Sequence, residues 1–277
     1  SGGLDVEASY WRLVTSDIRA ALRILRPVYD ESNGLDGYVS VEVDPGLARD
    51  SAGTETAARS LDEQLAAPHL YVKIPATAEG LDPIRQMIAE KRSINVTLIF
   101  SLGRYAEVME AYISGLMSAE GDLSDISSVA SFFISRLDVE VDRRLEAIGT
   151  PDALALRGKA AVANGKLAYS QFLETFSGPR WDALVARGAR VQRPLWASTS
   201  TKNPEYPDTL YVDKLIGPDT VNTLPDNTLD AFEDHGTIAR TIDADVAAAQ
   251  AVMDQLAEVG VDLNDVTQLL EVEGVAA

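Results

Sequence analysis

Short apolar runs rich in β-branched and aromatic residues alternate with longer helical segments, and this alternation constrains the fold more than any other feature. Between the runs, apolar residues recur every three or four positions, as on one face of a helix. The predicted strands are 38–43, 70–74, 94–100, 129–135, 191–197 and 220–224. Because helical crossovers join these strands, we expect a parallel sheet with helices covering it.

Helix-start signals accompany these crossovers. Ser16, Thr54 and Thr150 each precede a helical pattern, and each is expected to cap the helix that follows. Pro151, directly after Thr150, strengthens the last of these starts. Beyond Ser101, apolar residues follow helical spacing, and this stripe is predicted to belong to the core rather than to a cofactor site.

Polar residues stand at the carboxyl ends of several strands in succession. This pattern favours a barrel over a doubly wound sheet, in which the site lies at one switch point. The sequence has no glycine-rich dinucleotide fingerprint and no Walker motif. A (β/α)8 TIM barrel needs about eight strands, and six are found, all after residue 37. The expected fold is therefore α/β, a (β/α)8 TIM barrel with the first two strands missing from the given chain.

The sequence contains no internal repeat, low-complexity segment or linker, and 202–207 is expected to be a long loop after a strand. Residues 1–277 are thus predicted to form a single barrel domain, truncated at the N-terminus and at the C-terminus. We expect the natural protein to be longer at both ends. An open barrel would expose unpaired edges on strands 38–43 and 220–224, which favours aggregation.

Side chains alternate between the two faces of a strand, so one row packs under the helices and the other points into the barrel. In the strand that begins at Ile94, the row that includes Val96 and Leu98 is predicted to face the helices. Four strands together give the inward row, which consists of Ser40, Glu42, Tyr71, Lys73, Asn95, Thr97, Ser131, Phe133 and Ser135. An acid, an amine, an amide and several hydroxyls are therefore expected to converge on one interior.

This convergence indicates catalysis, because burying polar groups without partners costs free energy. A lysine held away from water favours the free amine, which attacks carbonyl groups and forms an imine. In this interpretation Lys73 is the nucleophile, and Glu42 and Thr97 take part in proton transfer. Contacts to the substrate are assigned to Asn95, Ser131 and Phe133. The simpler alternatives are a solvated edge strand carrying Lys73 and a structural ion pair involving Glu42.

A phosphate site requires cations, hydroxyls or backbone amides near the late loops of a barrel. Arg136 follows the strand that contains Ser131, and Ser198 and Lys202 lie in the loop after the strand 191–197. These three residues are the candidate phosphate ligands. The simpler alternative for Arg136 is an ion pair at the surface.

Composition excludes several classes of function. The formal net charge of −19 argues against a protein that binds nucleic acid through a basic surface. The chain has no cysteine and two histidines, so it offers neither a thiolate nucleophile nor a Cys- or His-rich metal site. No apolar run approaches the ~20 residues that cross a bilayer. We therefore expect a cytoplasmic enzyme with no nucleic-acid or membrane partner.

Five segments resemble the bacterial transaldolase family of the class I aldolase superfamily. They are VSVEVDP (39–45), VKIPAT (72–77), INVTLIFS (94–101), ASFFISRLD (130–138) and RPLWASTSTKNPEYPDTLYV (193–212). The likeness covers nearly the whole chain in order, and the second segment followed by the third is highly specific.

The resemblance implies a role for each matching residue. Lys73 is the Schiff-base lysine, Glu42 is the proton-transfer carboxylate, and Thr97 holds the catalytic water. Positions that line the substrate or phosphate site in the family match Asn95, Ser131, Phe133, Arg136 and Ser198. Lys202 extends this set, because an arginine follows the matching serine closely in the better-studied branch of the family. The first barrel strand of the family carries a catalytic aspartate and the second a Thr-Asn-Pro segment, and neither is found before residue 38.

The reaction implied by the resemblance transfers a dihydroxyacetone unit between sugar phosphates in the non-oxidative pentose phosphate pathway, with no metal or organic cofactor. The donors are sedoheptulose 7-phosphate or fructose 6-phosphate, and the acceptors are glyceraldehyde 3-phosphate or erythrose 4-phosphate. A monomer or a homodimer is expected. One alternative is a fructose 6-phosphate aldolase, although that group tends to carry a tyrosine at the position of Phe133. Another alternative is an inactive barrel fragment that serves as a binding module.

Overall fold

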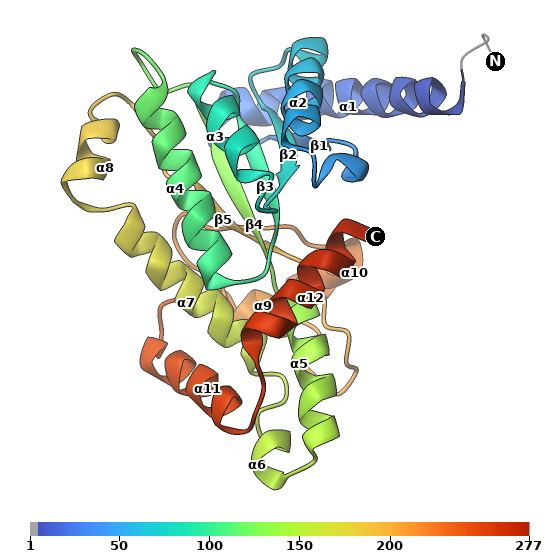
Figure 1. Cartoon of the computed structure of the whole chain (residues 1–277), viewed down its shortest axis with the longest axis vertical. Coiled ribbons are helices and arrows are strands. Elements are labelled where there is room, and N and C mark those ends of the chain that lie inside the picture. The colour runs from blue at the N-terminus through green and yellow to red at the C-terminus, as the bar shows by residue number, and fades with distance from the viewer. Residues whose placement is uncertain (1–4, 277) are drawn as a thin grey trace.

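The computed structural model describes residues 5–276, which contain one parallel sheet. Its six strands follow one another in space in the order of the sequence (Figure 1). The strands are β1 (Val39–Glu42), β2 (Leu70–Pro75), β3 (Ile94–Ile99), β4 (Ser128–Phe133), β5 (Arg193–Ala197) and β6 (Val221–Asn222). Each predicted strand is found, with ends that differ by up to two residues. β6 is only two residues long, and the prediction that Ser135 continues β4 is wrong, because Ser135 already begins the helix α5 (Ser135–Ile148).

Helices connect successive strands, as the alternating pattern predicts. The connecting helices are α2 (Ser51–Leu65), α3 (Leu81–Ala89), α4 (Leu102–Ser118), α5 (Ser135–Ile148), α6 (Pro151–Leu154), α7 (Ala160–Thr175), α8 (Gly178–Val185) and α9 (Leu210–Asp213). Helix α1 (Val6–Glu31) precedes β1, and α10 (Asp226–His235), α11 (Val246–Glu258) and α12 (Leu263–Ala276) follow β6. A 3-10 turn, η1 (Pro45–Leu47), follows β1. Among these described helices, none combines the length and the apolar character that spanning a lipid bilayer requires.

The sheet is curled. Asn95 of β3 reaches past β2, and its Nδ2 donates a hydrogen bond of 3.0 Å to Oγ of Ser40 on β1. Side chains on two strands that flank a third can meet in this way where their shared face is concave. The protein thus has an α/β fold with a curled parallel sheet of six strands, a half-barrel consistent with a TIM-barrel-like architecture.

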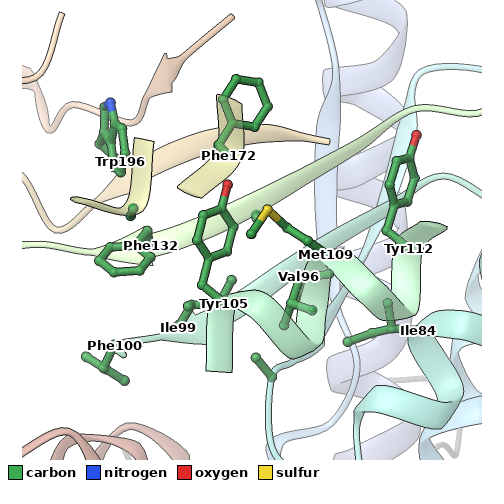
Figure 2. Close-up of a cluster of buried hydrophobic side chains, with 14 of the residues drawn as sticks. Ile84, Val96, Ile99, Phe100, Tyr105, Met109, Tyr112, Phe132, Phe172 and Trp196 are labelled. Atoms are coloured by element: carbon green, nitrogen blue, oxygen red, sulfur yellow. The ribbon is translucent and has the colours of Figure 1, made fainter. Parts of the chain in front are cut away.

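The main core lies between the sheet and the helices that cover it (Figure 2). The apolar stripe after Ser101 is confirmed as core, since Tyr105, Met109 and Tyr112 of α4 are fully buried. The Tyr105 ring meets the edge of Phe132 from β4 at a centroid distance of 5.6 Å. Burying large aromatic and aliphatic side chains of this kind is the dominant stabilising contribution to a fold.

A second, smaller cluster occupies the concave face of the sheet. It contains Tyr71, Val129, Leu195 and Ala197. The ring of Tyr38 stacks on Tyr71 with centroids 4.2 Å apart. The predicted alternation of side chains therefore holds over the middle of the strands, where one row packs under helices and the other lines the concave face.

Two predicted helix starts are wrong, because an aspartate upstream caps the helix instead. The carboxylate of Asp5 accepts a hydrogen bond from the Ala8 amide, so α1 begins well before Ser16. Asp50 caps α2 in the same way, and the hydroxyl of Thr54 instead bonds to a backbone carbonyl. The third prediction is confirmed, since Thr150 accepts from the amide of Ala153 at the start of α6.

The prediction that Leu98 continues the helix-facing row of β3 is also wrong. The pairing of β3 with β4 shifts between Val96 and Ile99, so β3 contains one extra residue there. Leu98 has a φ of +60° and is only half-buried. A β-bulge of this kind interrupts the alternation of side chains and bends the strand.

Candidate active site

Lys73 and Glu42 meet near the carboxyl ends of β2 and β1. The parallel register places the two residues opposite each other, and Lys73 Nζ lies 3.4 Å from a carboxylate oxygen of Glu42. The two side chains are 30% and 45% exposed, respectively. The pair is therefore open to a ligand from solvent while the two charged ends remain in contact.

Asn95 extends this row onto the next strand, because its Cα pairs with that of Lys73. The Asn95 side chain is almost fully buried, and Ser131 Oγ on β4 donates to its Oδ1 at 2.7 Å. Its Nδ2 donates to Ser40, as described above. These two bonds fix the orientation of the amide, which leaves the second N–H free to recognise a hydroxyl or carbonyl group.

Ser40 is a residue that the predicted site did not include. The alternation of side chains in β1 had placed it on the inner face, but a serine in a strand carries little chemical signal by itself. Only the three-dimensional contact with Asn95, which is 55 residues later, reveals its role in holding the amide. Ser40, Asn95 and Ser131 form one hydrogen-bonded chain across the concave face.

Thr97 lies on the same face as Asn95, one pleat nearer the carboxyl end of the sheet. Its Cα pairs with Pro75, two residues after Lys73, and its side chain is 2% exposed. The amide of Ala76 donates to the carbonyl of Thr97 at 2.7 Å, which fixes the backbone at this point. The structure thus brings Thr97 to the end of the sheet where Lys73 and Glu42 lie.

Phe133 and Arg136 lie together where β4 ends and α5 begins. The Phe133 ring is half-buried and packs against Phe100 with ring centroids 5.1 Å apart. Cζ of Arg136 lies 5.4 Å from the centroid of the Phe133 ring. This cation–π contact restrains the guanidinium group at the mouth of the sheet.

Ser198 is bound to the start of the same helix. Its φ is +56°, and its carbonyl accepts from the Ser135 amide at 2.9 Å. The hydroxyls of Ser135 and Ser198 are also 2.9 Å apart. Arg136, Ser198 and the first turn of α5 therefore gather a cation, hydroxyls and the positive end of a helix at one place.

Lys202 lies in the loop that follows β5. Its Nζ donates to Oγ of Ser200 at 2.8 Å. It lines a cavity of about 230 Å³ together with Asp142, Tyr206 and Tyr211, on the side of α5 that faces the 202–207 loop. The structure thus gives Lys202 a local partner in its own loop and a different cavity.

A buried carboxylate behind the site was missed by the sequence analysis. Asp138 accepts hydrogen bonds from the hydroxyl of Tyr211 at 2.8 Å and from the amide of Ala161 at 2.7 Å. Burial raises its pKa to about 6. Asp142, one turn later, accepts from the Tyr206 hydroxyl and the Gly158 amide, and burial raises its pKa as well. These bonds fasten α5 to the loop that follows β5.

The curled α/β sheet with polar side chains at its carboxyl edge places the chain in the class of barrel-like enzymes. Residues 2–277 match the family model described as Transaldolase/Fructose-6-phosphate aldolase. The chain belongs to this family, and the resemblance seen in the sequence is confirmed.

Curated relatives support the assignment over nearly the whole chain. The chain is 54% identical to the transaldolase of Parafrankia sp. (strain EAN1pec) and to that of Thermobifida fusca (strain YX). It is 53% identical to the transaldolase of Mycolicibacterium smegmatis (strain ATCC 700084 / mc(2)155). Each of the three alignments covers 99% of this chain and 75% of the relative.

Proposed function

We propose that this chain is a transaldolase, which transfers a dihydroxyacetone unit from a ketose phosphate to an aldose phosphate in the pentose phosphate pathway. The observation that carries the proposal is the position of Lys73, whose Nζ lies 3.4 Å from Glu42 at the carboxyl edge of the sheet. The names of the relatives support the same activity. The ketose donor is sedoheptulose 7-phosphate or fructose 6-phosphate, and the acceptor is glyceraldehyde 3-phosphate or erythrose 4-phosphate.

The reaction begins when the amine of Lys73 adds to the carbonyl carbon of the ketose. Glu42 supplies a proton to the departing hydroxyl, water leaves, and an imine to Lys73 remains. Thr97 holds the water through which this proton moves. The bond between the α and β carbons of the imine then breaks. Its electron pair passes into the imine system and forms an enamine.

The leaving fragment departs as an aldose phosphate: its hydroxyl gives its proton to a base, the task that the resemblance assigns to the aspartate of the family's first barrel strand, and the carbon–oxygen bond becomes that of an aldehyde. The enamine attacks the aldehyde of the acceptor, and the carbon–carbon bond that forms restores the imine. Water then hydrolyses the imine and releases the new ketose phosphate. Asn95 and Ser131 hold hydroxyl groups of the bound unit, and the ring of Phe133 forms an apolar wall beside it.

The phosphate group binds at the mouth of the sheet. Arg136 supplies the cation, Ser198 supplies a hydroxyl, and α5 supplies the positive end of its dipole. Lys202 donates one hydrogen bond to Ser200 and has two further donors, and we place it as the outermost member of the proposed set. Arg136 follows β4 and Ser198 follows β5, so the cation and the hydroxyl approach the phosphate from the ends of two different strands.

The finer features of the assembly belong to the same proposal. We infer a single (β/α)8 barrel domain, and the curl of the six-stranded sheet supports it. The proposed enzyme acts in the cytoplasm as a monomer or homodimer. Its partners are sugar phosphates, and the imine chemistry needs neither a metal nor an organic cofactor.

Borohydride reduction in the presence of fructose 6-phosphate tests the proposal. Reduction converts the imine to a stable amine, so we expect an adduct of the sugar unit on the peptide that contains Lys73. The adduct is expected to vanish in Lys73→Ala and to persist in the control Lys214→Ala, which removes an exposed lysine. Absence of any adduct with wild-type protein would remove the enzymatic interpretation and leave the binding-module alternative.

An assay of acceptor dependence separates transfer from simple cleavage. A transaldolase consumes fructose 6-phosphate only when an acceptor such as erythrose 4-phosphate is present. A fructose 6-phosphate aldolase instead releases free dihydroxyacetone without an acceptor. Phe133 favours transfer, because it offers no hydroxyl to protonate the enamine before the acceptor arrives.

A further inference from the structure

The carboxyl end of β3 carries a bulge immediately after Thr97. Pairing with β4 runs regularly up to Val96 and resumes at Ile99, which pairs with Phe132. Between the pair formed by Val96 and the pair formed by Ile99, β3 therefore advances by three residues while β4 advances by two. A bulge re-aims the side chains on either side of it, and Thr97 is one of the two residues inside this irregular segment.

Leu98 adopts the left-handed backbone conformation in this bulge, with a φ of +60°. This region is unfavourable for a residue with a β-carbon, and it is rarely occupied by leucine. Strained backbone of this kind persists where surrounding contacts hold it, and it is frequent near functional sites. The side-chain contacts of Leu98 are therefore of interest for what holds this conformation.

The last helix, α12, provides those contacts. A β-carbon built on Gly274 would lie 2.9 Å from Cδ2 of Leu98, so the tip of the leucine packs directly against the helix at this glycine. The same β-carbon would lie 3.6 Å from the ring of Phe100. Figure 1 shows α12 beside α5, at the edge where the strands end, and α12 also contacts β3 and η1.

Ion pairs hold α12 in this place. Glu271 is mostly buried and pairs with Arg49 at 3.0 Å and with Arg104 at 3.7 Å. Arg49 follows β1 and Arg104 lies in the first turn of α4. At the other end of the helix, Asp265 pairs with Arg144 of α5 at 2.7 Å. Contacts with three different parts of the carboxyl edge fix the helix against Leu98.

We propose that Leu98 is a positioning residue, and that the bulge it forms against Gly274 of α12 aims Thr97 at the Lys73–Glu42 pair. The inference rests on the proposed function, in which Thr97 holds the water used in imine formation. Leu98 turns out of the strand toward α12, and this turn keeps the neighbouring Thr97 buried on the concave side. The C-terminal helix thereby contributes to catalysis without touching the substrate.

Leu98→Gly tests this role, because glycine adopts a positive φ freely but cannot anchor the bulge to α12. We expect the rate of borohydride-trapped imine formation to fall about tenfold, since small misplacements of a catalytic group have effects of this size or larger. KM for fructose 6-phosphate is expected to stay within about twofold. Leu98→Met keeps the apolar contact and should restore most of the rate. Val272→Ala, at an exposed position of α12, is the control and should match wild type.

A double-mutant cycle with Thr97→Ala separates positioning from a general loss of structure. If Leu98 acts through Thr97, adding Leu98→Gly to Thr97→Ala causes no further loss of rate. Gly274→Val offers an independent approach, because it displaces Leu98 from the other side and should reproduce the Leu98→Gly rate. Circular dichroism and the thermal midpoint confirm that each variant is folded.

Two outcomes overturn the inference. A Leu98→Gly protein that forms the imine at the wild-type rate shows that the bulge does not position Thr97. Fully multiplicative losses in the double mutant show that Leu98 acts independently of Thr97. In both cases wild-type protein still forms the adduct, so the proposed function survives; a wild-type protein that forms no adduct overturns the function and the inference together.

Discussion

Lys73 and Glu42 face each other on adjacent parallel strands, with Nζ of the lysine 3.4 Å from a carboxylate oxygen. Both side chains retain contact with solvent, and exposed ion pairs add little to the stability of a fold. A pair that contributes little stability but lies at the carboxyl edge of a curled sheet is well placed for chemistry. Its loss should therefore affect the reaction far more than the folding.

Replacing the carboxyl group tests this separation. In Glu42→Gln we expect imine formation to slow by about 10²–10⁴-fold, as is typical for the loss of a general acid or base. The free energy of unfolding should change by less than about 1 kcal/mol. Rapid-quench borohydride trapping measures the first quantity and urea denaturation the second. Glu63→Gln, at an exposed ion pair with Arg92, is the matched control and should leave the rate and the free energy of unfolding unchanged. An unchanged rate of imine formation in Glu42→Gln would contradict the role assigned to Glu42.

Local alternation was enough to predict most of the inner face. Lys73 and Asn95 lie on the face that the sequence predicts. In a regular strand the apolar row packs against the helices, so the other row must lie on the inner face. The same rule failed at Leu98, where a bulge in the pairing of β3 with β4 interrupts the alternation and the side chain lies against Gly274, a residue 176 positions away in sequence (274 minus 98). No local pattern carries that information.

Two helix starts were also predicted wrongly, and the side-chain direction of Lys202 was not predicted at all. Asp5 and Asp50 cap their helices in place of the predicted residues, because several capping residues precede each helix and the sequence does not rank them. Lys202 lies in a long loop, where the strand rule gives no direction for a side chain. Its Nζ donates to Ser200, and it lines a cavity together with Tyr206.

Ser40 should matter because it holds the amide of Asn95. In Ser40→Ala the Nδ2 group of a nearly buried side chain loses its acceptor, which costs about 1–3 kcal/mol. Part of this cost appears as lower stability, and the freed amide also rotates. We expect kcat/KM for fructose 6-phosphate to fall by about tenfold, mainly through KM, since one hydrogen bond to the substrate is misplaced.

Steady-state kinetics and thermal unfolding measure the two effects. Ser60→Ala provides the control, because Ser60 is exposed and accepts a hydrogen bond from Gln64 within α2. A Ser40→Ala protein with unaltered KM would show that the amide of Asn95 needs no support from β1.

The raised pKa of Asp138 predicts that the free energy of unfolding depends on pH. Burial raises its pKa from 3.8 to about 6, so the folded protein retains a proton that the unfolded chain has already lost between these values. The contribution of Asp138 to stability therefore falls as the pH rises from about 4 to about 6, by roughly 3 kcal/mol. Below about pH 4 Asp138 is protonated in both the folded and the unfolded protein, and above about pH 6 it is ionised in both.

Asp138→Asn should remove this slope, because the amide does not titrate. We expect the difference in unfolding free energy between wild type and Asp138→Asn to change steadily from pH 4 to pH 6 and to stay constant above it. Taking the difference cancels the effect of carboxylates such as Glu110, whose pKa is lowered to about 2 chiefly by Arg180. Urea denaturation across the window measures the difference, and Asp152→Asn, at an exposed site, is the control. A constant difference from pH 4 to pH 7 contradicts the prediction.

The close packing of α3 against α4 gives a prediction for the fold alone. Gly115 of α4 lies so near α3 that a β-carbon would come within 2.7 Å of the Arg85 carbonyl and 2.8 Å of the Ile88 side chain. Backbone on a neighbouring helix cannot yield easily, so Gly115→Val must push the two helices apart. Overpacking of this kind costs about 1–3 kcal/mol. Gly103, in the first turn of the same helix, has no atom within 4 Å of its added β-carbon.

The two glycines should therefore respond in opposite directions. Gly103→Ala is expected to raise the free energy of unfolding by about 0.5–1 kcal/mol, because alanine loses less backbone entropy on forming a helix. Gly115→Val is expected to lower it, with imine formation at Lys73 little affected while the protein remains folded. Urea denaturation of both variants measures the changes. Equal stability of the two proteins would mean that α3 can move away from α4 at little cost, contrary to the tight contact at Gly115.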